Sequence, residues 1–274
     1  MPELHPAGYA SVRPLVPPSH DAGHMTFAHA VLDGTLPARV FVDDVAAPRT
    51  ALICPDCGFF LALGAPSAGF VDALVPELAC DSVDRPNEAS LIVASTPAWE
   101  AALDGVLRTK ERRNEYHYEP RGTSAPRLSG GLRLEPIDEG IARQFGFGID
   151  PWVIRTWGGP AGFVARSFGL AVMAGDELAA ICAACALGGG EAEIEIATDP
   201  RYRRRGLAVA AGEAFIAECS RRGLVPAWTC ASRNEPSVRS AARLGFVQFR
   251  DVACYPLRPY LERINGRWEI PERG

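Results

Sequence analysis

The N-terminal half of the chain alternates short apolar runs with turn residues. Runs of about four to eight apolar residues between Gly, Pro, Asp or Ser residues predict buried strands, and apolar positions three and four residues apart predict helices. The Gly, Ser and Pro residues between Pro120 and Pro126 predict a linker. We therefore expect strands at Ala38–Asp43, Thr50–Cys54, Gly58–Leu63, Ala89–Ser95 and Arg112–Glu119, and helices at Met25–Leu32, Ala68–Cys80 and Ala98–Leu107.

The C-terminal half has a longer and more regular pattern. A strand at Leu132–Ile137 and a helical segment ending near Phe145 precede a hairpin that turns at Gly175–Asp176. A hairpin followed by strand–helix–strand–helix–strand is typical of an α+β (mixed α/β) fold, in which helices flank a mixed, mostly antiparallel central sheet. The expected strands are Phe168–Ala174, Leu178–Leu187, Glu191–Thr198, Val225–Ala231 and Phe246–Leu257, and the expected helices are Gly206–Arg222 and Pro236–Leu244.

The two halves place their elements in nearly the same order along the chain. A length of 274 residues allows one large domain or two modest ones, at about 100–200 residues per domain. We therefore predict two domains, residues 1–125 and residues 126–274. Because no repeat is visible residue by residue, we interpret the N-terminal α/β domain as a degenerate copy of the C-terminal one.

The composition narrows the classes of function. The chain is 47% hydrophobic and 22% charged, as in ordinary globular proteins, and its net charge of −5 argues against a nucleic-acid partner. The start, Met1–Pro6, lacks the basic and apolar regions of a secretory signal. The longest nearly apolar run, Leu178–Leu187, is shorter than the roughly 20 residues that span a bilayer. We expect a cytoplasmic protein with no membrane partner.

The eight cysteines include two pairs with Cys-x-x-Cys spacing. Cys54 and Cys57 flank a Pro-Asp turn, which predicts a hairpin tip. Cys182 and Cys185 fall in an apolar run that predicts a buried strand, where residues three apart point to opposite faces. Since two such sulfurs cannot share an ion, we predict no metal site and interpret the remaining cysteines as small core residues.

The most informative segment joins a strand to a helix through a basic loop. Pro200 ends the strand Glu191–Thr198 because proline cannot donate to a ladder. Gly206 then opens a helix with an apolar stripe, directly after three arginines. Free amides and the positive end of a helix dipole make such a junction an anion site. The alternative is a solvated basic run or a nucleic-acid patch, which the acidic net charge disfavours.

This loop, Arg203–Ala208, is similar to the Arg/Gln-x-x-Gly-x-Gly/Ala motif of the GNAT N-acetyltransferases. In that family the loop holds the pyrophosphate of acetyl-CoA, the preceding strand pairs with the pantetheine arm, and a second helix ends in Leu-Gly-Phe, as Leu244–Phe246 does here. The resemblance implies the GNAT fold and acetyl-CoA as cofactor. It implies cofactor contacts from Ile196, Ala197, Thr198, Arg203, Arg204, Arg205, Gly206, Leu207, Ala208, Asn234 and Ser237. For Asn234, a helix N-cap is an alternative that is compatible with this role.

Acetyl transfer to an amine requires a group that removes a proton from nitrogen. All five histidines lie at or before His117, which excludes histidine as the base unless the N-terminal half supplies it. Glu191, Glu193 and Glu195 alternate on one face of a strand, which indicates that this face borders a wet cleft. We predict Glu193 or Glu195 as the base, the alternative being solvated or salt-bridged carboxylates. A backbone amide near Ile196 is expected to stabilise the oxyanion.

The chain departs from the family where many members have a tyrosine that protonates the thiolate. Seven residues after Asn234 the chain has Ala241. Either Tyr255 or Ser240 replaces that tyrosine, or the thiolate, with a pKa of about 8.5, leaves without a dedicated acid. For Tyr255 a packing role is the alternative.

The N-terminal half carries a further resemblance. Val40–Asp44, Pro48–Ile53 and Phe59–Gly64 are similar to the zwittermicin A resistance subgroup of the family. This implies acetylation of a primary amine of a small molecule, such as an aminopolyol or another antibiotic-like amine, and it allows a homodimer. Gly64–Gly69 lacks the Arg-x-x-Gly-x-Gly motif. This half is therefore expected to form one side of the substrate cleft without binding acetyl-CoA.

Two other functions stay open from the sequence. One is a non-catalytic GNAT-like module that senses acyl-CoA, which the missing tyrosine favours. The other is a tandem-GNAT aminoacyl transferase that uses charged tRNA, which should show a basic channel that the net charge does not favour.

Overall fold

The computed structural model describes residues 1–17, 25–74, 90–120, 128, 130–146 and 148–257, with the backbone of two short strands, β12 (Glu262–Ile264) and β13 (Arg267–Glu269). Residues 68–74 are helical, as predicted, whereas the rest of that expected helix and most of the expected linker lie outside the described residues. The chain forms two compact units. The first comprises Met1–Asn114, Ala231–Arg233 and Arg250–Gly274, and the second comprises Glu115–Cys230 and Asn234–Phe249.

The first unit contains a sheet whose strands pair in the order β1, β2, β3, β4, β11. The strands β3 and β4 are parallel, and the other neighbours are antiparallel. The turn between β2 and β3 confirms the hairpin tip predicted from Cys54 and Cys57. The elements are η1 (Pro6–Leu15), α1 (Met25–Leu32), β1 (Ala38–Val42), β2 (Thr50–Pro55), β3 (Phe59–Gly64), β4 (Leu91–Ala94), α3 (Pro97–Asp104) and the C-terminal part of β11 (Phe246–Pro256).

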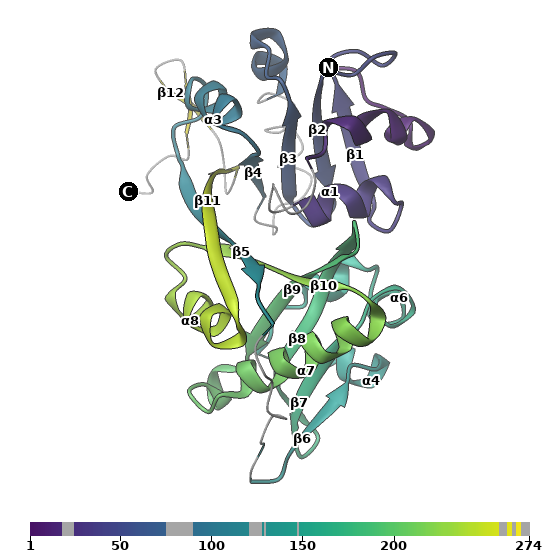
Figure 1. Ribbon diagram of the computed structural model, residues 1–274, viewed down its shortest axis with the longest axis vertical. Coiled ribbons are helices and arrows are strands. Elements are labelled where there is room, and N and C mark those ends of the chain that lie inside the picture. Colours follow the sequence, from purple (N-terminus) through teal and green to yellow (C-terminus); the bar gives the residue numbers. More distant parts are fainter. Residues whose placement is uncertain are drawn as a thin grey trace. The chain divides into compact units, whose positions relative to one another are not determined.

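The second unit contains the strand order β5, β10, β9, β8, β7, β6, with β9 and β10 parallel and the pairs from β6 to β9 antiparallel (Figure 1). This confirms the predicted mixed, mostly antiparallel sheet. The elements are β5 (Glu111–Tyr118), β6 (Leu132–Pro136), α4 (Glu139–Ala142), α5 (Trp152–Thr156), α6 (Pro160–Arg166), β7 (Gly169–Ala174), β8 (Glu177–Gly188), β9 (Glu191–Thr198), η2 (Pro200–Tyr202), α7 (Leu207–Arg222), β10 (Val225–Ala231) and α8 (Glu235–Leu244).

Helix α7 packs across β7, β8 and β9 (Figure 1). Its apolar side meets the sheet through Phe215, whose ring stacks on Phe168 with centroids 4.9 Å apart. Gly212 allows α8 to approach, since a Cβ there would stand 2.5 Å from Leu244 Cδ1. The helix ends at Gly223, which adopts φ +70° and closes the last turn. We call this core, between the sheet of the second unit and the helices α7 and α8, the α7 core.

The compact units do not follow the two halves of the sequence. Residues 115–118 of β5 belong to the second unit, although they come from the N-terminal half, and residues 250–256 of β11 belong to the first. The division predicted after residue 125 therefore differs from the observed units. Sequence patterns assign a strand to its neighbours along the chain, whereas its hydrogen-bonded partners decide the unit to which it belongs.

Candidate cofactor and acceptor site

The buried carboxylate of Asp199 stabilises the loop after β9 through hydrogen bonds with Arg201. Asp199 is 2% exposed and accepts hydrogen bonds from the amide of Arg201 at 2.8 Å and from its guanidinium at 2.9 Å. These contacts hold the pKa of Asp199 below its usual value. Gly148 lies so close that a Cβ there would collide with this carboxylate. These contacts of Asp199 fix the conformation of the backbone directly after β9.

The N-terminus of α7 has bare backbone donors. Gly206 is the N-cap, with φ +76° and no capping side chain, and its carbonyl accepts from the amide of Ala210 at 3.1 Å. The helix therefore begins at Leu207, one residue later than predicted. The amides of Leu207, Ala208 and Val209 have no acceptor within the helix, as in any first turn. Among the described residues, no other backbone acceptor meets them. These free amides give the N-terminus of α7 a partial positive charge next to the loop.

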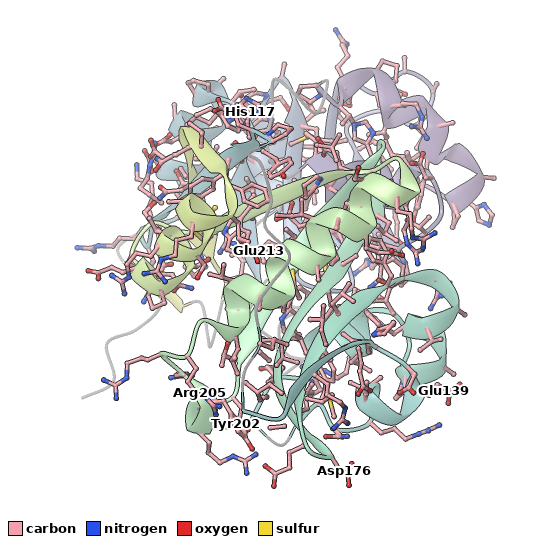
Figure 2. All side chains as sticks on the ribbon, turned by 60° about the horizontal axis from the view of Figure 1, so that its bottom comes forward. His117, Glu139, Asp176, Tyr202, Arg205 and Glu213 are labelled. Carbon is pink, nitrogen blue, oxygen red and sulfur yellow. The ribbon has the colours of Figure 1, made fainter. Side chains whose placement is uncertain are left out.

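Three exposed arginines, Arg203, Arg204 and Arg205, directly precede the start of this helix. Arg203 Nε donates to the carbonyl of Thr198 at 3.4 Å, and Arg204 adopts φ +64°. The guanidinium of Arg205 lies 5.7 Å from the centre of the Tyr202 ring, and both side chains reach the surface of the loop (Figure 2). Together the free amides and the arginines fit a doubly charged phosphate group.

The strand edge beside this loop is unpaired over its last residues. The ladder between β9 and β10 joins Val225–Ala227 to Glu191–Glu193 and ends there. On its other side β9 stays paired with β8 as far as the Thr198–Ala180 pair. Ile196, Ala197 and Thr198 are half-buried on the edge that β10 leaves open. Backbone donors and acceptors on such an edge can pair with the amides of an extended ligand.

The glutamates of β9 occupy different environments. Glu193 is 2% exposed, and its Oε1 accepts a hydrogen bond from the Thr229 hydroxyl at 2.9 Å. Glu191 and Glu195 are half-buried. The expectation that all three glutamates face a wet cleft is therefore wrong for Glu193. This side chain is buried and bonded to Thr229 of the neighbouring strand β10. Glu195, beyond the end of the ladder, keeps access to solvent.

Asn234 and Ser237 form the start of α8. Asn234 Oδ1 accepts from the amide of Ser237 at 3.3 Å, which confirms the helix-cap alternative. The hydroxyl of Ser237 accepts from Trp228 Nε1 at 3.2 Å. Trp228 is buried in the α7 core, as its packing interpretation predicted. A contact of Asn234 or Ser237 with a cofactor stays a prediction.

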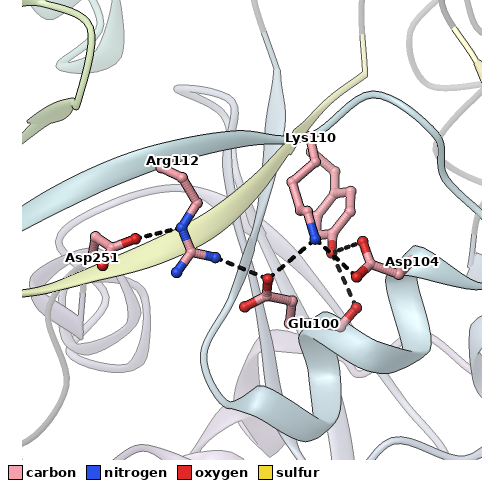
Figure 3. Close-up of polar contacts among 6 residues, drawn as sticks. Glu100, Asp104, Lys110, Arg112 and Asp251 are labelled. Atoms are coloured by element: carbon pink, nitrogen blue, oxygen red, sulfur yellow. Dashed lines mark hydrogen bonds and ion pairs between the residues drawn. The ribbon is translucent and has the colours of Figure 1, made fainter.

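Tyr255 is a packing residue, and its prediction as the acid is wrong. Its side chain is 0% exposed in the core of the first unit. The hydroxyl lies 2.8 Å from Asp104 Oδ1 and 3.0 Å from the carbonyl of Glu100, beside an ion-pair cluster that includes Lys110 and Arg112 (Figure 3). Burial raises the pKa of Tyr255 well above its usual value. Such a phenol has no access to a ligand.

Ser240, the other substitute, donates its hydroxyl to the carbonyl of Pro236 at 2.9 Å within α8. Ala241 beside it is fully buried. Neither residue presents an acid, so the structure offers no replacement for the missing tyrosine at this helix.

His117 lies in the second unit, although the sequence analysis placed its strand in the N-terminal domain. It is the only histidine in the sequence of that unit, and its side chain is exposed. Its ring stacks on Phe249 with centroids 3.9 Å apart and planes 17° apart. The sequence excluded histidine as the base unless the N-terminal half supplied it, and this strand comes from that half. No local signal marks that strand as part of the second unit.

The cysteines of the described residues are all free thiols. Cys182 lies in the α7 core, and Cys185 Sγ donates to the carbonyl of Glu193 at 3.3 Å on the other side of the sheet. The two sulfurs face apart, as the strand period predicted. Within the described part of the chain no group of three or more His, Cys, Asp or Glu side chains is arranged to hold a metal ion, and no helix is long and apolar enough to cross a bilayer.

A strand that parts from its parallel neighbour, followed by a basic loop and a helix start with free amides, is an arrangement suited to a ligand that carries phosphate. Residues 20–255 match the family model of the GNAT acetyltransferases. The chain therefore belongs to the GNAT acetyltransferase family and is an acyltransferase of the N-acetyltransferase class.

Individual relatives agree with this assignment. The chain is 29% identical over 235 residues to the uncharacterized N-acetyltransferase YdfB of Bacillus subtilis strain 168, covering 84% of this chain and 89% of that protein. A crystal structure of a GCN5-related N-acetyltransferase-like protein from Streptococcus suis is 18% identical, with a TM-score of 0.69 over 90% of this chain and 98% of that one. A tandem GNAT protein from the clavulanic acid biosynthesis pathway is 14% identical, with a TM-score of 0.61 over 93% and 96%. Both structures show the same fold.

Proposed function

We propose that this protein is an acetyl-CoA-dependent N-acetyltransferase that acts on a primary amine of a small molecule. The observation that supports this best is the bare N-terminus of α7 beside the unpaired edge of β9. Free amides at Leu207, Ala208 and Val209 and the arginines before them provide the donors and the charge for a diphosphate. Family membership supports acetyl-CoA as the molecule that carries it.

The backbone geometry fits this cofactor. A Cβ built on Gly206 would meet no atom within 4 Å, so phosphate oxygens can come close to the backbone there. The edge of β9 at Ile196–Thr198 provides amide partners for the pantetheine arm. When bound, acetyl-CoA supplies the thioester carbonyl carbon that the amine attacks. A backbone amide near Ile196 or Ala197 then stabilises the oxyanion as a preorganised donor.

We propose that Glu195 removes the proton from the amine, directly or through water. An alkyl amine has a pKa of about 10 and is protonated near neutral pH, so it requires such a base. Glu195 is half-buried beyond the end of the ladder, whereas Glu193 is enclosed and bonded to Thr229. Glu193 is proposed as a second carboxylate that favours a cationic acceptor. With no acid at position 241, the thiolate leaves unassisted.

The resemblance of the N-terminal half supports a narrower acceptor class. We propose that the chain belongs with the zwittermicin A resistance proteins and acetylates an aminopolyol or a similar antibiotic-like amine. A screen that follows thiol release over amines, aminopolyols and aminoglycosides tests this. Release with simple alkyl amines and none with polyhydroxylated ones would contradict the narrower class while leaving the reaction intact.

The cofactor site is tested by Gly206→Glu with Gly223→Glu as its matched control. Both glycines adopt φ near +70°, at opposite ends of α7, so each variant carries similar left-handed strain of about 1–2 kcal/mol. Only Gly206→Glu places a carboxylate at the anion site. Losing two charge-assisted hydrogen bonds, at about 1.5–3 kcal/mol each, should weaken acetyl-CoA binding by roughly 100-fold or more in titration calorimetry.

Two results would overturn the proposal. Equal affinity of Gly206→Glu and Gly223→Glu for acetyl-CoA would show that the nucleotide binds elsewhere. Tight binding by the unmodified protein, without thiol release for any amine of the panel, would instead identify a sensor of acyl-CoA.

A further inference from the structure

The arginines of the second unit differ in whether a carboxylate neutralises them. Most of them form an ion pair, as Arg201 in the loop between β9 and α7 does with Glu177 at 2.9 Å. The next arginines of the same loop, Arg203, Arg204 and Arg205, are exposed and form no ion pair with any described residue. The ion-paired arginines of this unit are Arg133, Arg143, Arg155, Arg201, Arg221, Arg222 and Arg239.

The last two of these arginines lie at the surface of the loop. The Tyr202 hydroxyl donates to Glu177 Oε2 at 2.9 Å, which fixes the tyrosine ring. The guanidinium of Arg205 lies 5.7 Å from the centre of that ring, and the ring supports it through a cation–π contact (Figure 2). The side chain of Arg204 makes no hydrogen bond with any described residue. Both guanidiniums therefore keep their N–H donors available to a ligand.

Together these groups supply more positive charge than a diphosphate requires. Each phosphate within the diphosphate of acetyl-CoA carries a single negative charge. The free amides at the start of α7 and Arg203, whose Nε donates to the carbonyl of Thr198 at the end of β9, already offset most of that charge. Arg204 and Arg205 add two further guanidiniums, each with several N–H donors. This excess indicates a ligand with another anionic group close to the diphosphate.

We propose that Arg204 and Arg205 bind the 3′-phosphate of acetyl-CoA and so distinguish this donor from thioesters that lack the group. The proposal rests on the proposed function and deepens it. The 3′-phosphate is joined to the diphosphate through a single ribose, so it remains close to the loop when the diphosphate is bound at the start of α7. As a monoester it carries a charge of about −1.5 to −2 and three acceptor oxygens.

Guanidinium groups suit such a phosphate better than backbone amides do. A guanidinium donates two parallel hydrogen bonds to one phosphate, and it keeps its charge at any pH at which the protein is folded. The two side chains are exposed, so they can follow a group that lies at the surface of the bound cofactor. Their exposure also means that salt screens the interaction strongly.

The test compares acetyl-CoA with acetyl-3′-dephospho-CoA, which lacks only this phosphate, by titration calorimetry at low salt. The unmodified protein should bind acetyl-CoA about tenfold more tightly or better. Arg204→Gly and Arg205→Gln should each lose much of this preference while their affinity for the dephospho compound stays the same. Glycine is chosen at position 204 because the backbone there has φ +64°, so the variant should unfold at no lower temperature.

Arg243→Gln is the matched control, because Arg243 on α8 is also exposed and forms no ion pair with a described residue. It should keep the full preference for acetyl-CoA. Equal affinity of the unmodified protein for the two thioesters would overturn the proposal. So would a preference that survives in the double variant of Arg204 and Arg205, or one that Arg243→Gln reduces as much. If neither thioester bound to the unmodified protein, the proposed function itself would fail.

Discussion

Glu191 lies on the same face of β9 as Glu195 and carries the same charge. Comparing variants of the two residues therefore distinguishes a specific role of Glu195 as base from a general effect of negative charge. Glu191 is also half-buried but lies at the start of β9, where Val225 pairs with it. Glu195→Gln should lower kcat by about 100-fold while the affinity for acetyl-CoA stays the same, because it removes the proposed base without altering the loop between β9 and α7. Glu191→Gln should leave both quantities unchanged.

Steady-state thiol release and calorimetry on the two variants measure this. Full activity in both Glu195→Gln and Glu193→Gln would reject a carboxylate of β9 as the base. Equal losses in Glu191→Gln and Glu195→Gln would assign the effect to the general charge of the strand face.

The stability that Asp199 gives to the loop between β9 and α7 should depend on pH. The hydrogen bond from Arg201, more than any other contact, holds the pKa of Asp199 below its unfolded value of about 3.9. A depressed folded pKa contributes stability above the unfolded value, and this stability is lost as the pH falls through the folded value. Asp199→Asn should therefore lower the free energy of unfolding near neutral pH and have a shrinking effect below about pH 4.

Urea unfolding across that pH range measures the difference. Asp176→Asn, at an exposed turn between β7 and β8, is the control and should change little at any pH. A destabilisation by Asp199→Asn that stays constant down to the lowest pH would show that the ion pair with Arg201 is not its cause.

At the level of elements, local patterns predicted the strongly periodic segments well. α1, β9 and β10 begin and end at the predicted residues, and α7 differs only at its first residue, where Gly206 adopts φ +76° and stays outside the helix. These segments carry their own signals, namely an apolar period, a breaker such as Pro200, and a glycine at the helix end.

The elements that the sequence missed are stabilised by contacts far along the chain. α5 and α6 are short, and Gly158 and Gly159 between them are poor helix formers. Tertiary packing holds them instead, as when Trp157 Nε1 donates to the carbonyl of Ala184 in β8 at 2.9 Å. The pattern of apolar residues within such a short segment cannot predict a contact with a distant strand.

The same limit applies to the site. The loop Pro200–Gly206 is contiguous in sequence, so the start of α7 could be predicted from its arginines and Gly206 together with the strand before it and the helix after it. The environments of Glu193, Tyr255 and His117 depend on Thr229, Asp104 and Phe249, which lie on other elements. Strand alternation gives the face on which a residue lies, but only the neighbouring strands decide whether it is enclosed.

At the scale of the whole molecule, the two units each require strand segments from the other half of the sequence. Tyr116 and Tyr118 of β5 pack into the α7 core, and Tyr255 of β11 fills the core of the first unit. Burying a large apolar side chain stabilises a fold by about 1.5–3 kcal/mol, against a net stability of about 5–15 kcal/mol. A cut after residue 125 leaves each fragment without such residues and with an unpaired sheet edge.

We therefore predict that residues 1–125 and residues 126–274, produced separately, do not unfold cooperatively, and that coexpression restores a stable complex. Thermal unfolding followed by circular dichroism and calorimetry measures this. The informative comparison is a fragment beginning at residue 108, which restores β5 to the second unit and should recover part of its cooperativity. If residues 126–274 alone melted at the temperature of the full chain and bound acetyl-CoA with equal affinity, β5 would be dispensable.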